Sequence, residues 1–249
     1  MFCRWPKVVL FGDSLTERSF DDGQWGAILQ NKLQRRCDVV NRGYGGYNTT
    51  WGRVLLPGIM GKEICNQVDI AAIVIFLGAN DSTSPGEDLY VPIELYKENL
   101  QAMVNYLKTV NVTPDKIIFV SPPPVNETAL STCCRGKWKT DEQAAEYTQV
   151  CCDVAKDNGA ECLNLYRAIH DEENWTQYMH SDGVHLSTAG GQFLESQLWP
   201  MVEKKAEEFN TKFPSWEDFE KYEPRPREII SPKMIKQLTI EDPDELEES

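Results

Sequence analysis

A serine stands directly after the first apolar run of the chain, where its hydroxyl could act as a nucleophile. Residues Lys7 to Phe11 have the continuous apolar character of a short buried strand, and Gly12-Asp13-Ser14 follows at once. Glycine and aspartate favour a sharp turn there, which would present the serine hydroxyl at the end of the strand. Taken alone, the segment is more often a helix cap, because serine and aspartate are common capping residues.

A base for this serine has to be one of three histidines, His170, His180 or His185. His185 stands in the sequence Asp182-Gly183-Val184-His185, and the other two lack such a context. An aspartate three residues before a histidine can fold back in a turn and hold the imidazole Nδ1–H, which leaves Nε2 free to accept a proton. We therefore expect Asp182 to orient His185, and the other two histidines to lie on helix or loop surfaces.

Two further strand ends carry groups that could stabilise a developing negative charge. The run Asp38 to Asn41 precedes a loop with three glycines in four residues, which lets backbone N–H groups approach a ligand closely. The run Ala71 to Leu77 is the strongest strand pattern in the chain, and Asn80 follows it with an amide that can donate to an oxyanion. Each segment alone reads equally well as an ordinary loop or turn. Both segments directly follow apolar strands, and this shared position indicates a functional site.

The elements that must position these residues alternate between short apolar runs and longer helical stretches. Strands separated by helices form βαβ units and a parallel sheet, and right-handed crossovers place helices on both of its faces. Ligands of such open sheets bind beyond the carboxyl ends of the strands. The expected strands are Lys7 to Phe11, Asp38 to Asn41, Ala71 to Leu77, Lys116 to Val120 and Glu161 to Leu165. The expected helices are Trp25 to Arg36, Leu95 to Val110, Thr140 to Asn158 and Ser187 to Phe209, the last kinked or interrupted at Pro200.

Composition narrows the classes of partner. The chain has 249 residues and a net charge of −14, which fits one α/β domain and argues against binding to nucleic acid or to anionic membranes. No signal-peptide pattern precedes the first strand, and no segment approaches the ~18 consecutive apolar residues of a membrane span. We therefore expect a cytoplasmic protein without integral membrane association, acting on a small molecule.

The eight cysteines are expected to be reduced thiols. The cysteines of two adjacent pairs, Cys133-Cys134 and Cys151-Cys152, cannot form a disulfide with each other without severe strain. The sequence contains no C-x-x-C spacing, so a zinc site is not expected. Near the end of the chain, Glu241 to Glu248 carries six acidic residues and no basic one. We expect residues 1–222 to form the catalytic domain and residues 223–249 an acidic, poorly ordered extension.

Four blocks taken together resemble the SGNH, or GDSL, hydrolase family. They are Gly12-Asp13-Ser14-Leu15, the glycine loop ending at Gly46, Gly78-Ala79-Asn80-Asp81 and Asp182-Gly183-Val184-His185. Within that family, Asn41-Arg42-Gly43-Tyr44 and Leu198-Trp199-Pro200 resemble the isoamyl acetate-hydrolysing esterase homologues. The likeness excludes the tail from Pro224 onward.

The resemblance implies a flavodoxin-like three-layer α/β/α sandwich with a five-stranded parallel sheet. It makes Ser14 the nucleophile, His185 the general base and acid, and Asp182 the orienting carboxylate. The oxyanion hole would consist of the N–H groups of Ser14 and Gly46 and the side chain of Asn80, with no metal or cofactor. Asp13 has no evident catalytic task and is expected to be structural. Gly45 departs from the serine that many relatives carry at that position, so a more flexible loop is expected.

The expected activity is hydrolysis of small carboxylic esters, with acetate or short to medium lipid-like acyl groups, through an acyl-enzyme. A thioesterase or a carbohydrate deacetylase would use the same residues with a different pocket. A catalytically silent scaffold that binds partners through the acidic tail is the alternative from another class. Trp25, Tyr47, Trp51 and Val184 could line an apolar pocket, although tryptophan and tyrosine are more often core residues.

Overall fold

Five short apolar segments form one parallel sheet in the computed structural model of this protein, which describes residues 5–61, 70–132 and 138–211. The strands are β1 (Lys7–Gly12), β2 (Asp38–Gly43), β3 (Ile70–Phe76), β4 (Ile117–Val120) and β5 (Glu161–Leu163). Their order across the sheet is β2-β1-β3-β4-β5, and every pairing is parallel. This is the flavodoxin-like order, which confirms the predicted fold class.

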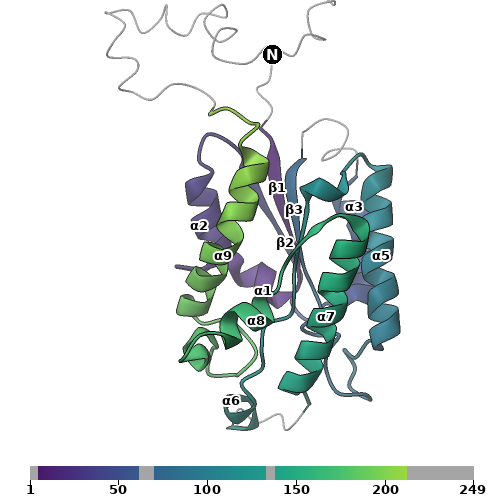
Figure 1. Ribbon diagram of the computed structural model, residues 1–249, viewed down its shortest axis with the longest axis vertical. Coiled ribbons are helices and arrows are strands. Elements are labelled where there is room, and N and C mark those ends of the chain that lie inside the picture. The colour runs from purple at the N-terminus through teal and green to yellow at the C-terminus, as the bar shows by residue number, and fades with distance from the viewer. Residues whose placement is uncertain (1–4, 62–69, 133–137, 212–249) are drawn as a thin grey trace, which may run out of the picture.

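Helices cover both faces of the sheet, so its central strands β1, β3 and β4 are buried at every position except Lys7. In β1, Val8 and Leu10 belong to one hydrophobic core while Val9 and Phe11 belong to the other, as side chains that alternate along a strand require. Figure 1 shows α2 and α9 on one side of the sheet and α3, α5 and α7 on the other. The helices are α1 (Ser14–Glu17), α2 (Trp25–Lys32), α3 (Thr49–Ile59), α5 (Ile93–Thr109), α6 (Glu127–Thr132), α7 (Asp141–Asn158), α8 (Leu165–His170) and α9 (Thr188–Ala206).

Two helices differ from their expected course. Helix α9 continues through Pro200, so the interruption allowed for there does not occur, since Leu198 and Val202 on either side of it are fully buried and their packing outweighs one missing N–H. The helix predicted from Trp25 to Arg36 ends at Lys32, and the chain turns there through Arg35, which adopts a φ of 60°.

Helix α3 was not predicted. Its sequence contains two glycines and Pro57, which are poor helix formers, and it follows a glycine-rich loop. The Asn48 side chain caps it by accepting from the N–H of Trp51 at 3.2 Å, and Leu56 anchors it in the core. Capping and burial therefore form a helix where propensity alone does not.

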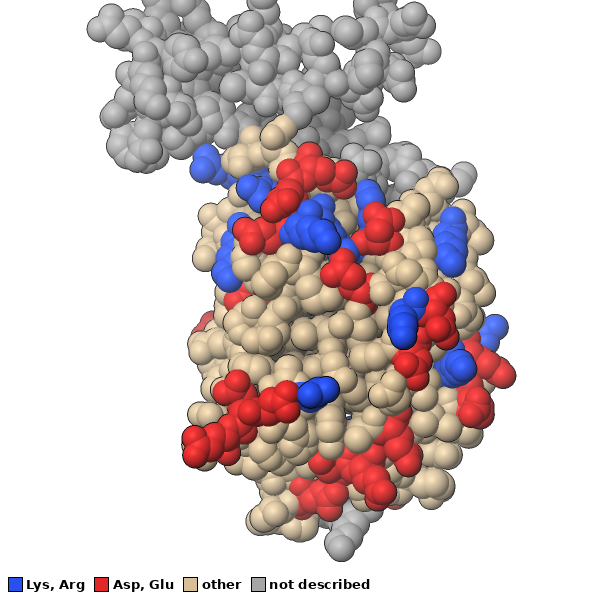
Figure 2. Space-filling view, viewed as in Figure 1, with Lys and Arg blue, Asp and Glu red and all other residues tan. Residues whose placement is uncertain are grey.

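Among the cysteines in the described part of the chain, Cys151, Cys152 and Cys162 are free thiols. The Cys133-Cys134 pair and the predicted acidic extension fall outside the described residues. Every helix in the described segments is too short or too polar to traverse a bilayer. On the face drawn in Figure 2, acidic side chains gather at the lower end of the molecule, toward which the strands run in Figure 1.

Candidate active site

The first strand delivers Ser14 to the carboxyl edge of the sheet. The strand ends at Gly12, and Asp13 caps the short helix α1 by accepting from the N–H of Leu15 at 2.9 Å. Ser14 is therefore the first residue of a helix, where backbone N–H groups lack a partner within the helix. The buried carboxylate of Asp13 is part of this cap, as its predicted structural role requires.

Ser14 meets the predicted histidine and aspartate at this edge. The Ser14 Oγ lies 2.9 Å from His185 Nε2, and His185 Nδ1 lies 2.7 Å from Asp182 Oδ2. The side chains of His185 and Asp182 are 24% and 26% exposed, so the group is shielded but open to a small molecule. A hydroxyl, an imidazole and a carboxylate in this order can carry out nucleophilic acyl transfer.

A tight turn holds the carboxylate of Asp182 in place. Its Oδ1 accepts from the backbone N–H groups of Val184 and His185, each at 2.9 Å, while Gly183 adopts a φ of 75°. Partial burial opposes ionisation of Asp182, but these two N–H groups and the His185 ring outweigh it and lower its pKa to about 2. The ionised carboxylate favours the tautomer of His185 that carries its proton on Nδ1 and offers the Nε2 lone pair to Ser14.

The loop after β2 brings a second set of donors beside Ser14. Gly43 packs directly on α1, because a Cβ at this position would lie 1.9 Å from the backbone nitrogen of Glu17. Gly46 has a φ of 79°, in the left-handed region that glycine tolerates best. The Asn80 side chain, from the loop after β3, donates to the carbonyl of Tyr47 at 2.9 Å. One N–H of the Asn80 amide thereby fixes the glycine loop, and the other remains for a ligand.

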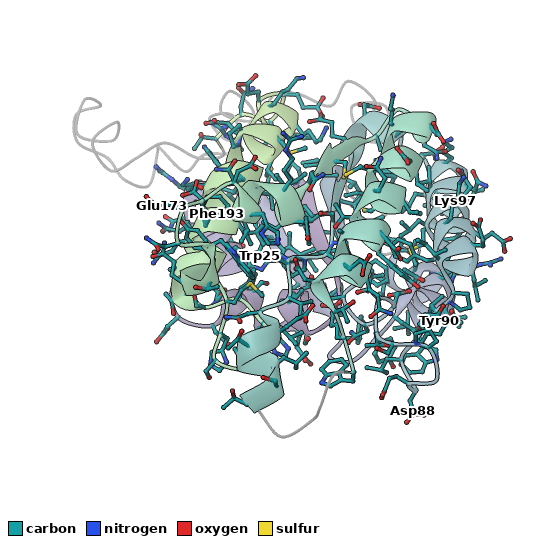
Figure 3. All side chains as sticks on the ribbon, turned by 60° about the horizontal axis from the view of Figure 1, so that its bottom comes forward. Trp25, Asp88, Tyr90, Lys97, Glu173 and Phe193 are labelled. Atoms are coloured by element: carbon teal, nitrogen blue, oxygen red, sulfur yellow. The ribbon has the colours of Figure 1, made fainter. Side chains whose placement is uncertain are left out.

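An aromatic group adjoins this loop. The ring centroids of Tyr44 and Tyr47 are 5.4 Å apart, those of Tyr47 and Trp51 are 5.5 Å apart, and Trp51 is 42% exposed. The expectation that Trp25 lines the pocket was wrong. Trp25 is completely buried against the sheet (Figure 3), where its indole N–H donates to the carbonyl of Leu15 at 3.0 Å.

The remaining candidate residues take other places. Val184 packs against a small apolar cluster that contains Val125 and Leu130, so it supports the Asp182–His185 turn from outside. His170 lies at the end of α8 and bonds Asp141 Oδ2 at 2.9 Å, which is a more enclosed position than the predicted surface. His180 is exposed as predicted, with its Nδ1 3.4 Å from Asp182 Oδ2. The sequence reasoning missed this second ring beside the carboxylate, although the spacing of two residues was visible.

Comparisons with known proteins agree with the fold and show the family. The sequence pattern of the GDSL-like Lipase/Acylhydrolase family matches residues 10–193. A protein of Homo sapiens named isoamyl acetate-hydrolyzing esterase 1 homolog is 40% identical over 227 residues, covering 88% of this chain and 90% of that protein. The GDSL esterase/lipase WDL1 of Oryza sativa subsp. japonica is 30% identical over 209 residues, covering 81% of this chain and 79% of that protein. Among solved structures, a lipase/acylhydrolase from Enterococcus faecalis matches 84% of this chain and 100% of its own with a TM-score of 0.65 and 22% identity, a likeness of fold.

Proposed function

Because the chain belongs to the GDSL-like lipase/acylhydrolase family and is a carboxylic ester hydrolase, we propose that Ser14 is its nucleophile. In this proposal His185 is the general base and acid, and Asp182 orients it. The observation that carries the assignment is the 2.9 Å contact between Ser14 Oγ and His185 Nε2, backed by the 2.7 Å contact between His185 Nδ1 and Asp182.

The proposed reaction has two halves. Ser14 Oγ attacks the ester carbonyl while His185 Nε2 takes the hydroxyl proton, and the resulting imidazolium returns that proton to the leaving alcohol. Water then attacks the acyl-enzyme, with His185 again as base, and releases the carboxylic acid and the free serine. Both halves pass through a tetrahedral oxyanion, and a residue that binds it accelerates both.

We assign the oxyanion site to the N–H groups of Ser14 and Gly46 and to the side-chain amide of Asn80. Three arguments support this assignment. Ser14 begins a helix, whose first N–H groups lack internal partners. Gly46 leaves open space around its α-carbon, since a Cβ there would meet nothing within 4 Å. Asn80 is tied to the glycine loop through the carbonyl of Tyr47, so the donors of Asn80 and Gly46 are held together.

The proposed substrate is a neutral ester with a small acyl group and an apolar character. Tyr47 and Trp51 offer an exposed aromatic surface next to the oxyanion loop, which suits an apolar alcohol or acyl chain. The acidic side chains that gather at the lower end of the molecule (Figure 2) disfavour anionic esters. Thioesterase and deacetylase activity would use the same residues, and a series of substrates separates them.

We also propose a cytoplasmic setting without nucleic-acid partners, and a catalytic domain over residues 1–222 followed by an acidic extension over 223–249. The free thiols of Cys151, Cys152 and Cys162 and the net charge of −14 support the setting. The family match over residues 10–193, which ends before the tail, supports the domain boundary.

The test compares the wild type with Ser14→Ala on p-nitrophenyl acetate, butyrate and octanoate, together with labelling by a fluorophosphonate. Loss of both turnover and labelling in Ser14→Ala, with retained folding, is the expected result. Ser196→Ala is the matched control, because Ser196 is an exposed serine on α9 and should change neither readout. Turnover by Ser14→Ala at the wild-type rate would exclude Ser14 as nucleophile.

A further inference from the structure

Three charged side chains are buried together beneath the candidate site. Asp13 and Asp81 are 0% exposed and Lys139 is 2% exposed. Burying a charge is costly unless it is paired and hydrogen-bonded, and removing one partner of such a group leaves the others uncompensated. None of the three has a role in the proposed reaction steps, so their burial requires another explanation.

Each carboxylate is attached to a different catalytic segment. Asp13 precedes Ser14 and holds the N–H of Leu15 at 2.9 Å. Asp81 follows Asn80 and accepts from both the N–H, at 2.9 Å, and the hydroxyl of Thr49. Since Thr49 begins α3 directly after the glycine loop, the carboxylate of Asp81 joins the loop after β3 to the loop after β2.

Lys139 spans the remaining part of the Asn80 turn. Its Nζ donates to the carbonyl of Ala79, the residue before Asn80. Its backbone forms an antiparallel bridge with Thr83, and the N–H of Ser84 donates to the carbonyl of Trp138 at 2.8 Å. The segment around Lys139 therefore holds the turn that carries Asn80 from both ends.

The charges of the three groups depend on one another. The Oδ2 atoms of Asp13 and Asp81 are buried and have no hydrogen-bond partner in the structure, so the ammonium of Lys139 is the compensating charge that acts on both. Burial raises the pKa of Asp13 to about 7 and that of Asp81 to about 6, and lowers the pKa of Lys139 to about 8. Burial, together with the nearby charge of Asp81, raises the pKa of two further hydroxyls, those of Tyr96 on α5 and Tyr147 on α7.

We propose that Lys139 is a positioning residue for ester hydrolysis, whose buried ammonium balances Asp13 and Asp81 and fixes the Ala79 carbonyl so that Ser14 and Asn80 keep their places. The proposal rests on the function proposed above for Ser14 and Asn80. It predicts that loss of Lys139 weakens transition-state stabilisation and leaves substrate binding nearly unchanged. The reason is that the three buried charges hold the segments that carry the oxyanion donors, and none of the three is assigned to substrate binding.

Lys139→Met tests this, since methionine keeps an unbranched side chain without the charge. The expected kcat on p-nitrophenyl acetate at pH 8 is lower by about a hundredfold, the usual effect of displacing one oxyanion donor, with KM changed by less than about threefold. The acid limb of kcat/KM should move to higher pH, because Asp81 without its cation binds a proton more readily. Lys97→Met is the control, because Lys97 is exposed on α5 at the edge of the molecule (Figure 3).

A double variant separates charge from packing. Asp13→Asn combined with Lys139→Met removes one buried charge of each sign. The kcat of this double variant should be at least about tenfold higher than that of Lys139→Met alone. A residue that acts by packing alone would give additive losses and an unshifted acid limb. Where Lys139→Met does not fold, the double variant carries the test. A kcat below that of Asp13→Asn alone, together with an acid limb of kcat/KM at higher pH than in Asp13→Asn, then supports the proposal. An equal kcat, an unshifted acid limb, or failure of both variants to fold overturns it.

The outcomes also separate this inference from the proposed function. Turnover by Ser14→Ala at the wild-type rate would overturn the proposed function, whatever the effect of Lys139→Met. An inactive Ser14→Ala together with a folded Lys139→Met that matches Lys97→Met in kcat and in pH profile leaves the function intact and overturns the role of Lys139.

Discussion

Asp182→Asn removes the charge of the triad carboxylate while leaving its turn intact. The Oδ1 of Asp182 accepts the N–H groups of Val184 and His185 at 2.9 Å each, and an asparagine carbonyl can accept both. The asparagine NH₂ would then replace Oδ2, which lies 2.7 Å from His185 Nδ1. Two N–H groups cannot face each other, so the imidazole must carry its proton on Nε2. That nitrogen lies 2.9 Å from Ser14 Oγ and can no longer accept its proton.

The catalytic effect follows from this change of tautomer. The same substitution in the Ser-His-Asp template lowers kcat by about 10⁴, and at about 1.36 kcal/mol per factor of ten this equals ~5.5 kcal/mol of transition-state stabilisation. We expect a loss of this size here, with little change in KM because Asp182 does not contact the substrate in the proposed mechanism.

The variant should also change how stability depends on pH. A pKa of about 2 in the folded protein, against an ordinary value of 3.8, corresponds to about 2.4 kcal/mol, which the 26% exposure of the side chain reduces to between about 1 and 2 kcal/mol. Because the folded pKa is the lower of the two, this stability is present above pH 3.8 and is lost as the pH falls toward 2. The variant lacks this contribution at every pH.

The assays are hydrolysis of p-nitrophenyl acetate at pH 7 to 9 and urea unfolding from pH 7 down to pH 3. The difference in unfolding free energy between wild type and variant should be constant above about pH 5 and narrow below pH 4. Asp171→Asn is the control, since that aspartate is 68% exposed in a surface pair with Arg167 and should alter neither readout. A kcat within tenfold of the wild type, or a stability difference equal at pH 3 and pH 7, would refute the reasoning.

Three further predictions concern the oxyanion site, the glycine loop and the tail. Asn80→Ala should lower kcat on p-nitrophenyl acetate by about a hundredfold or more at similar KM, and a wild-type kcat would exclude Asn80 as a donor. Gly43→Ala should destabilise the protein by at least about 2 kcal/mol in urea unfolding, because the added Cβ would meet the backbone of Glu17, whereas Gly58→Ala, with open space on α3, should be neutral or stabilising. A chain ending at Pro224 should keep kcat/KM within about twofold, since every candidate site residue precedes the tail, and a larger loss would assign the tail to the catalytic unit.

The central strands β1, β3 and β4 could be predicted from the sequence because they are buried on both faces. Such strands are continuous apolar runs, and β3 is buried at all seven positions. Helix α3 could not be predicted in the same way. Its start depends on Asp81, which holds the N–H and the hydroxyl of Thr49 across 32 residues of sequence. A contact between residues so far apart in the sequence leaves no pattern in the residues around α3.

The candidate site likewise contains residues that could be predicted from the sequence and one that could not. The arrangement of Ser14, His185 and Asp182 could be predicted because acyl-transfer chemistry demands a histidine beside a carboxylate, and few residues of the chain satisfy both demands. Lys139 could not be predicted, since a lysine outside any motif is ordinarily a solvated surface residue. Only the fold places it at 2% exposure against two buried carboxylates. For Trp25 the situation is the opposite: the sequence suggested a residue lining the pocket, and the structure places it in the core.

Strand order places the proposed nucleophile, which follows β1, between two neighbouring loops. This strand lies between β2 and β3, and its last residue, Gly12, pairs with Gly43 on one side and Phe76 on the other. A residue that leaves β1 therefore has the loops after both neighbours within reach, whereas the residue that follows an edge strand has one. The base arrives separately, on a turn closed by the bond between the His180 N–H and the carbonyl of His185 at 2.7 Å. We therefore expect the register of β1 against β3 to set the distance between Ser14 and Asn80.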